Sequence, residues 1–215
     1  MELAEILDCP QCRDGFGLVA FVRESENRRV LRGHLGCPIC EVEYPIIDGV
    51  IWIDATGAGR PLRPGAPAAH ADPELSLRLA ALLGLAERPR PLVLLGPGLG
   101  RHGAPLARLA TGAEAIAWLD PVDEEPPARG VGELARGVNP IRGADRGRWP
   151  VRSSSLHGIA LSEPWADMVE EAARCSRTGG RIVLPSPDSA MVAMLADVGF
   201  IELASDPGTW VGERC

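Results

Sequence analysis

The sequence predicts an α/β protein in which a doubly wound, mostly parallel sheet follows a small β-rich domain. Short apolar runs alternate with helical patterns after residue 72, which is typical of parallel strands covered by helices on both faces. One of these runs, 91–95, leads into alternating glycines. Two Cys-x-x-Cys pairs and their hairpin signals stand near the N-terminus. With 215 residues and 46% hydrophobic content, the chain can bury a substantial core.

The composition excludes several classes of function. All 22 basic residues are arginine, so mechanisms that need a lysine Schiff base or a P-loop lysine are excluded. The net charge of −7 argues against a general polyanion binder, and we do not expect a nucleic acid partner. No apolar run is long enough to span a membrane, and residues 1–5 lack the basic start of a signal peptide. We therefore expect a cytoplasmic protein.

The N-terminal cysteines predict a structural zinc site. Cys9 and Cys12 form one Cys-x-x-Cys knuckle, and Cys37 and Cys40 form another after 24 intervening residues. Four thiolates on two such knuckles can converge into the tetrahedron that zinc requires. Disulfides are disfavoured in a cytosolic chain, and no thioredoxin-like βαβ pattern follows either pair to favour a redox role.

Two hairpins accompany the knuckles. Residues 17–22 and 29–35 are strand candidates on either side of a polar turn. After the second knuckle, residues 43–47 and 50–53 are joined by Asp48-Gly49, which is the strongest short hairpin signal.

The run Tyr44-Pro45-Ile46-Ile47-Asp48-Gly49-Val50, after two Cys-Pro-x-Cys knuckles, resembles the small zinc-ribbon family typified by the activator subunit of tRNA and release-factor methyltransferases. The resemblance covers residues 1–54. It implies a role in binding a protein partner or in stabilisation, and no chemistry of its own.

A linker and a helix come next. Residues 55–71 are rich in Gly, Pro and Ala without periodicity, so we interpret them as a semi-stiff linker before a second domain, 72–215. Asp72-Pro73-Glu74 predicts an N-cap, a proline at the first helical position and an acid in the first turn.

The apolar run ending at Leu95, the glycines Gly96, Gly98 and Gly100, and the helical pattern 104–110 read as strand, tight loop and helix. Glycine permits positive φ and close approach of a ligand to the main chain, and a helix start offers N–H groups to an anion. We expect the carboxylate or phosphate of a cofactor to lie there.

The remaining elements continue the alternation. Asp120 ends one strand candidate and Asp145 ends another. The strand candidates are 115–119, 138–144, 158–161, 181–185, 200–203 and 209–212, and the helix candidates are 131–136, 167–176 closing at Thr178-Gly179-Gly180, and 191–198.

This order of motifs, over residues 72–215, resembles a class I S-adenosylmethionine-dependent methyltransferase, which has a Rossmann-like fold. The resemblance implies that the glycine loop holds the methionine part of S-adenosylmethionine, that Asp120 binds the ribose hydroxyls, and that Asp145 faces the adenine amino group. Two positions depart from the family pattern. Leu94 stands where an acid usually precedes the loop, and His157 stands where an Asp commonly opens the fourth strand.

Two other functions stay open. The departures favour a catalytically silent scaffold or regulatory subunit, a pseudoenzyme. The pattern Gly98-x-Gly100-x-x-Gly103 followed by Asp120 also fits a dinucleotide-binding protein, which we rank third. The sequence identifies no catalytic residue, and we expect His157 to be structural. The basic residues near the predicted cleft can either receive an anion or pair with the acids at 123–125; they are Arg142, Arg146, Arg148 and Arg152.

Overall fold

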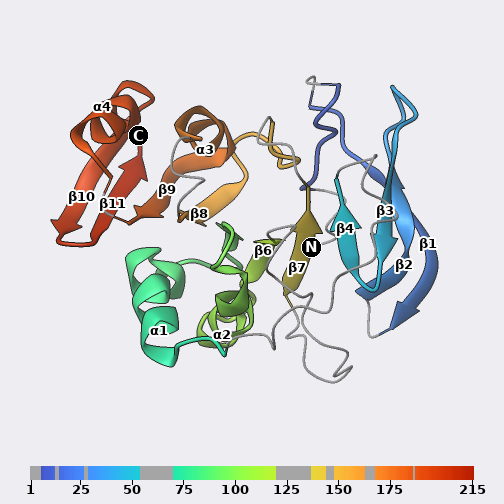
Figure 1. Ribbon diagram of the computed structural model, residues 1–215, viewed down its shortest axis with the longest axis horizontal. Helices are drawn as coiled ribbons and strands as arrows, with labels where there is room; N and C mark the ends of the chain where they lie inside the picture. The colour runs from blue at the N-terminus through green and yellow to red at the C-terminus, as the bar shows by residue number, and fades with distance from the viewer. Residues whose placement is uncertain are drawn as a thin grey trace.

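The computed structural model describes residues 6–12, 15–26, 29–53, 70–119, 137–143, 148–162, 168–185 and 187–215. Its strands and helices alternate as the sequence predicts, and they are shown in Figure 1. The strands are β1 (Val19–Glu26), β2 (Arg29–Gly36), β3 (Glu43–Ile47), β4 (Val50–Trp52), β5 (Leu92–Leu95), β6 (Glu114–Leu119), β7 (Val138–Arg142), β8 (Leu156–Ala160), β9 (Ser176–Leu184), β10 (Phe200–Asp206) and β11 (Thr209–Arg214). The α-helices are α1 (Pro73–Leu82), α2 (Gly103–Leu109), α3 (Val169–Cys175) and α4 (Ser189–Asp197), with short 3-10 turns η2 (Leu85–Glu87) and η3 (Gly100–His102).

The described strands form one eleven-stranded sheet in the order β1-β2-β3-β4-β7-β6-β5-β8-β9-β11-β10. Strands β7, β6, β5, β8 and β9 are parallel neighbours, and β11 is antiparallel to both β9 and β10. The chain runs outward from β5 on one side and returns to β8 on the other, so the topological switch lies between β5 and β8. Ligands of such sheets bind outside the carboxyl ends of the strands at this point.

Helices cover both faces of this sheet. Figure 1 shows α1 and α2 on one side and α3 and α4 on the other. The side chains of β5 alternate between the two cores: Leu92 and Leu94 pack with the α3 and α4 residues, whereas Val93 and Leu95 pack with α1 and α2. Burial on both faces explains why β5 is a continuous apolar run, as expected for a central parallel strand.

The N-terminal β-rich part continues the sheet of the larger part. β4 pairs in parallel with β7, with Ile51 opposite Ile141 and Trp52 opposite Arg142. Figure 1 shows β4 beside β7, although more than eighty residues separate them along the chain. The backbone N–H of Ile53 also donates to the carbonyl of Arg142 at 2.7 Å.

The two parts also share a core. Ile6 and Leu7, from the segment before the first knuckle, belong to the same buried cluster as Trp149 and Val151. The backbone N–H of Arg152 donates to the carbonyl of Ile6 at 3.0 Å. The division at residues 54 and 72 remains a prediction, and residues 55–69 of the predicted linker lie outside the described residues.

Local sequence signals predicted most ends of the helices and strands, and one predicted helix end was wrong. α1 begins at Pro73, and the Asp72 carboxylate accepts from the backbone N–H of Glu74 at 2.9 Å, as an N-cap should. The sequence predicted that the helix before β9 would close at Thr178-Gly179-Gly180, but α3 ends at Cys175. Ser176 pairs with Leu156 of β8, so strand pairing begins there. Gly179, at φ +73°, lies inside β9 and does not cap a helix.

The helix predicted at 131–136 lies outside the described residues. Among the helices that the structure does describe, none combines the length and the apolar character needed to span a bilayer.

Candidate functional site

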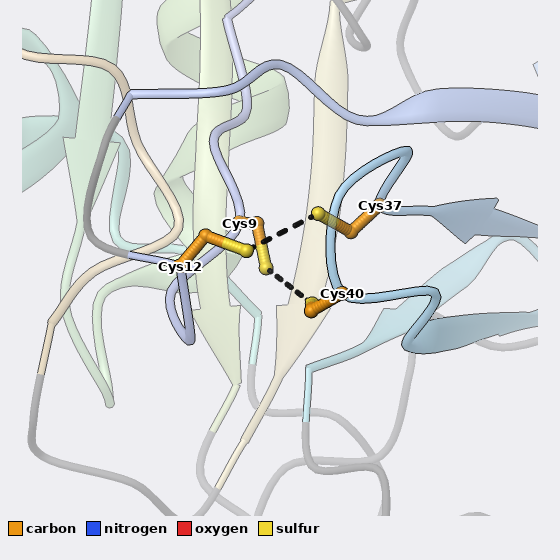
Figure 2. A group of neighbouring side chains, drawn as sticks. All are labelled: Cys9, Cys12, Cys37 and Cys40. Carbon is orange, nitrogen blue, oxygen red and sulfur yellow. Dashed lines mark hydrogen bonds between the residues drawn. The ribbon is translucent and has the colours of Figure 1, made fainter.

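The four N-terminal cysteines converge on one point, as Figure 2 shows. Their Sγ atoms all lie within 4.8 Å of one another. The Sγ atoms of Cys9 and Cys40 are 3.7 Å apart, and those of Cys12 and Cys37 are 3.5 Å apart. A disulfide needs about 2.05 Å between sulfurs. A tetrahedron with Zn–S bonds of about 2.3 Å instead needs edges of roughly 3.8 Å, so the thiols fit zinc.

Two backbone turns place these thiols. In the first, the N–H of Cys9 donates to the carbonyl of Phe16 at 3.0 Å; in the second, the N–H of Cys37 donates to the carbonyl of Val42 at 2.9 Å. Glu41 has φ +60°, and its backbone N–H closes the second turn by donating to the carbonyl of Cys37. Each knuckle therefore presents two side chains to the same side.

Hydrogen bonds lower the pKa of one of the four thiols. Burial raises the pKa of Cys37, but hydrogen bonds from the N–H groups of Cys40 and Ile39, together with those from the thiols of Cys12 and Cys40, lower that pKa to about 7. The pKa of Cys12 is raised instead, first by its hydrogen bond with Cys40 and then by burial. Four crowded thiols cannot all ionise without a cation, and a bound zinc ion would remove this conflict.

Tyr44 of β3 contacts the cysteine cluster through its hydroxyl group. Its side chain is fully buried, and its hydroxyl lies 3.5 Å from Cys9 Sγ. A Cys9 thiolate bound to zinc would accept a hydrogen bond from the Tyr44 hydroxyl, which would fix the orientation of the ligand.

Tyr44→Phe is expected to weaken zinc binding by about tenfold, because loss of an outer hydrogen bond typically costs 10- to 100-fold in metal affinity. Competition with a chromogenic chelator measures the change. Tyr44→Phe keeps the buried ring, so the fold should be retained. Unchanged zinc affinity would show that the hydroxyl does not support the ligand.

The glycine loop leaves β5 at the switch point. The N–H of Gly96 donates to the carbonyl of Ala160 at 2.9 Å, which holds the loop against the end of β8. The Ser162 hydroxyl donates to the carbonyl of Pro97. Gly98 has φ +77°, and among the described residues a Cβ added there would meet only Ser162 Oγ, at 3.9 Å. The described part of the structure thus leaves the main chain of the loop open to close approach at this residue, as a ligand cradle requires.

The two predicted carboxylates, Asp120 and Asp145, lie outside the described residues. The strands that precede them are described. Leu119, at the end of β6, is in register with Arg142, at the end of β7. Because β5, β6 and β7 are parallel, their carboxyl ends lie on the same edge of the sheet as the glycine loop.

Two described members of the predicted arginine cluster, Arg142 and Arg152, have different neighbours in the structure. Arg142 is 5% exposed and its guanidinium lies 5.5 Å from the centre of the Trp52 ring. Arg152 instead pairs with the buried carboxylate of Asp8 at 3.3 Å. Trp52 was not singled out by the sequence, since only the pairing of β4 with β7 brings it to Arg142.

His157 lies away from the glycine loop. Its Nδ1 accepts from the backbone N–H of Leu92 at 3.1 Å, at the amino ends of β8 and β5. Burial lowers the pKa of His157, assisted by Arg177 and Arg88. This is a structural position on the opposite edge from the candidate crevice.

A second histidine, His102, was missed by the sequence analysis. It ends η3, directly after the glycine loop, and is fully buried. Its Nδ1 lies 2.8 Å from the hydroxyl of Ser76, which is also buried, on α1. Only tertiary packing of α1 against the loop brings the pair together.

Comparison with known proteins identifies the fold. The sequence matches no family model, and no curated protein is significantly similar to it. Geranyl diphosphate methyltransferase in complex with SAM matches with TM-score 0.55 and 13% identity, over 66% of this chain and 85% of that one. The geranyl diphosphate C-methyltransferase of Streptomyces coelicolor A3(2) gives 0.53 and 14%, over 66% and 76%. Precorrin-6y C5,15-methyltransferase of Geobacter metallireducens GS-15 gives 0.50 and 12%, over 70% and 93%.

These likenesses show the fold of class I S-adenosylmethionine-dependent methyltransferases, a mixed and mostly parallel sheet. An N-terminal cysteine cluster that fits zinc is joined to it.

Proposed function

We propose that the chain binds S-adenosylmethionine at the carboxyl ends of β5, β6 and β7 and transfers its methyl group to a substrate. The observation that carries this proposal is the glycine loop at the switch point of a methyltransferase fold, where a Cβ added at Gly98 would meet, among the described residues, only Ser162 Oγ at 3.9 Å. The sulfonium of the cofactor supplies an already activated methyl group, so the protein has mainly to bind and orient.

The residues present are suited to the cofactor. The main chain of Gly96, Gly98 and Gly100 would hold the methionine part. Asp120, directly after β6, would accept hydrogen bonds from the ribose hydroxyls, and Asp145 would face the adenine amino group. A carboxylate is an acceptor only, so it matches such hydroxyl and amino donors.

Calorimetric titration of the zinc-loaded protein with S-adenosylmethionine and S-adenosylhomocysteine tests the proposal. Binding of either supports it, as would copurification of one of them. Absence of binding at millimolar ligand would favour the catalytically silent scaffold. The buried Leu94 favours the scaffold function, because class I methyltransferases usually carry an acid at this position.

Asp120→Ala is expected to weaken S-adenosylmethionine binding by roughly 10- to 150-fold, because hydrogen bonds to a charged group contribute about 1.5–3 kcal/mol. Asp206→Ala is the matched control. Asp206 is also a strand-end carboxylate, but β10 is separated from β5 by three strands. If Asp120→Ala binds as tightly as the wild type, Asp120 does not hold the ribose.

We further propose that the zinc ribbon stabilises the methyltransferase-like part of its own chain. The resemblance to an activator subunit suggested a protein partner. The parallel pairing of β4 with β7 and the shared core support a partner within the same chain. No separate subunit is then needed for this role.

A further inference from the structure

A group of hydrogen-bond donors lies at the amino ends of β8 and β9, on the opposite edge of the sheet from the glycine loop. In the pairing of these two strands, the four residues 177–180 of β9 stand opposite the single residue His157 of β8. Arg177 Nη1 lies 2.8 Å from His157 Nε2, in a contact that is exposed to solvent. Arg88, directly after η2, donates to the backbone carbonyl of Gly179 in the same four-residue segment. Two guanidinium groups and one imidazole therefore lie where a ligand in solution can reach them.

Counting hydrogens shows that two of these donors face each other. The backbone N–H of Leu92 donates to His157 Nδ1 at 3.1 Å, so Nδ1 carries no hydrogen. Burial lowers the pKa of His157, with Arg177 and Arg88 adding to the effect, so the ring is neutral. A neutral imidazole has one N–H, which must then be on Nε2. Because a guanidinium group only donates, Nε2–H and Arg177 Nη1 need a shared acceptor.

Carboxylates near this edge pair with a different arginine. Glu87 and Glu213 both pair with Arg181, at 3.8 Å and 3.4 Å. Among the residues that the structure describes, no carboxylate contacts Arg88 or Arg177. The remaining N–H groups of these two guanidinium groups can therefore donate to an anion from solution.

We propose that His157, Arg177 and Arg88 bind a phosphate group. A phosphate oxygen between His157 Nε2 and Arg177 accepts from both, which removes the conflict between the two donors. Arg177 is exposed, so its side chain can move to admit that oxygen. Two guanidinium charges match a phosphate dianion, whereas a carboxylate carries only one charge. The site is on the opposite edge from the glycine loop, so it does not depend on binding of S-adenosylmethionine.

Titration of the zinc-loaded protein with inorganic phosphate tests the proposal. Nitrogen-15 NMR of the free protein should show His157 protonated on Nε2 only, and the signals of Nε2 and its hydrogen should shift as phosphate is added. A ring protonated on Nδ1 would contradict the count of hydrogens. Signals that do not move at millimolar phosphate would overturn the proposal.

Calorimetry of variants identifies the residues that hold the phosphate. Arg177→Gln and His157→Asn should each weaken phosphate binding by roughly 10- to 100-fold. Asparagine removes the Nε2 donor, but its amide oxygen can still accept from the N–H of Leu92, so the fold should be retained. Arg32→Gln is the matched control, because it removes the same charge from an exposed arginine of β2 that pairs with Glu24. It should leave the affinity unchanged, and equal weakening by Arg32→Gln and Arg177→Gln would overturn the proposal.

A second titration, with phenyl phosphate, identifies the source of the phosphate group. Tighter binding of phenyl phosphate than of inorganic phosphate would indicate a phosphorylated small molecule, and weaker binding would indicate the free ion. His157→Asn should weaken the binding of both. If it weakens neither, His157 does not contact the phosphate and the proposed site is wrong.

Discussion

Removal of zinc from the four-cysteine cluster is expected to unfold the whole described sheet, from β1 to β11, in one transition. Structural zinc contributes about 10–16 kcal/mol in zinc-finger peptides at neutral pH, whereas a domain is stable by only about 5–15 kcal/mol. The free energy of zinc binding is thus large enough to determine whether the zinc-binding part folds. How far the unfolding extends depends on the contacts between that part and the rest of the chain.

Because the two parts share one core, we expect the unfolding to extend into the larger part. Cys9 and Cys37 belong to the same buried cluster as Trp149, Ile141 and Ile159 of the larger part. If the knuckles open, Ile6 and Leu7 leave this core and β7 loses its neighbour β4. Loss of packed side chains costs about 2–5 kcal/mol for each large residue. The predicted division into a zinc ribbon, 1–54, and a second domain, 72–215, would instead confine the unfolding to residues 1–54.

Hydrogen exchange after treatment with a zinc chelator measures the extent of unfolding. Amides of β5 and β8 should lose protection together with those of β2 and β3. Cys9→Ser and Cys37→Ser should have the same effect, whereas Cys215→Ser, at an exposed C-terminal thiol, should have none. Protection retained in β5 and β8 of the chelated protein would show that the larger part folds alone.

Features that the sequence predicted well are local. Asp72-Pro73-Glu74 specifies a helix start by its own hydrogen bond, and Asp48-Gly49 specifies the turn between β3 and β4, where both residues have positive φ. The cysteines converge because each pair lies in one tight turn. The mostly parallel sheet with helices on both faces followed from the alternation of β and α patterns.

What the sequence missed depends on contacts between distant segments. Nothing local in Val50–Trp52 indicates pairing with Val138–Arg142, and β4 is only three residues long. Ser76 and His102 look unremarkable until α1 packs on the loop. Gly179 and Gly180 resembled a helix end, because glycine suits both a helix C-cap and a strand irregularity.

Gly98→Val is expected to abolish S-adenosylmethionine binding while leaving the protein folded. Gly98 has φ +77°, and an added Cβ meets only Ser162 Oγ, at 3.9 Å, within the part of the chain that the structure describes. The substitution therefore costs backbone strain of about 1–2 kcal/mol but causes no clash within the described residues. Its valine would instead fill the space above the loop, where the methionine part of the cofactor is proposed to lie.

Gly179→Val separates strain from occlusion. Gly179 has nearly the same φ, +73°, and no described residue lies within 4 Å of an added Cβ. Both variants should lose a similar amount of stability in a denaturant titration, because both place a branched side chain in the left-handed region. Only Gly98→Val should lose cofactor binding in calorimetry. If the two variants bind equally well, the space above Gly98 is not the cofactor site; if both lose binding, strain in the sheet, and not occlusion of the loop, controls affinity.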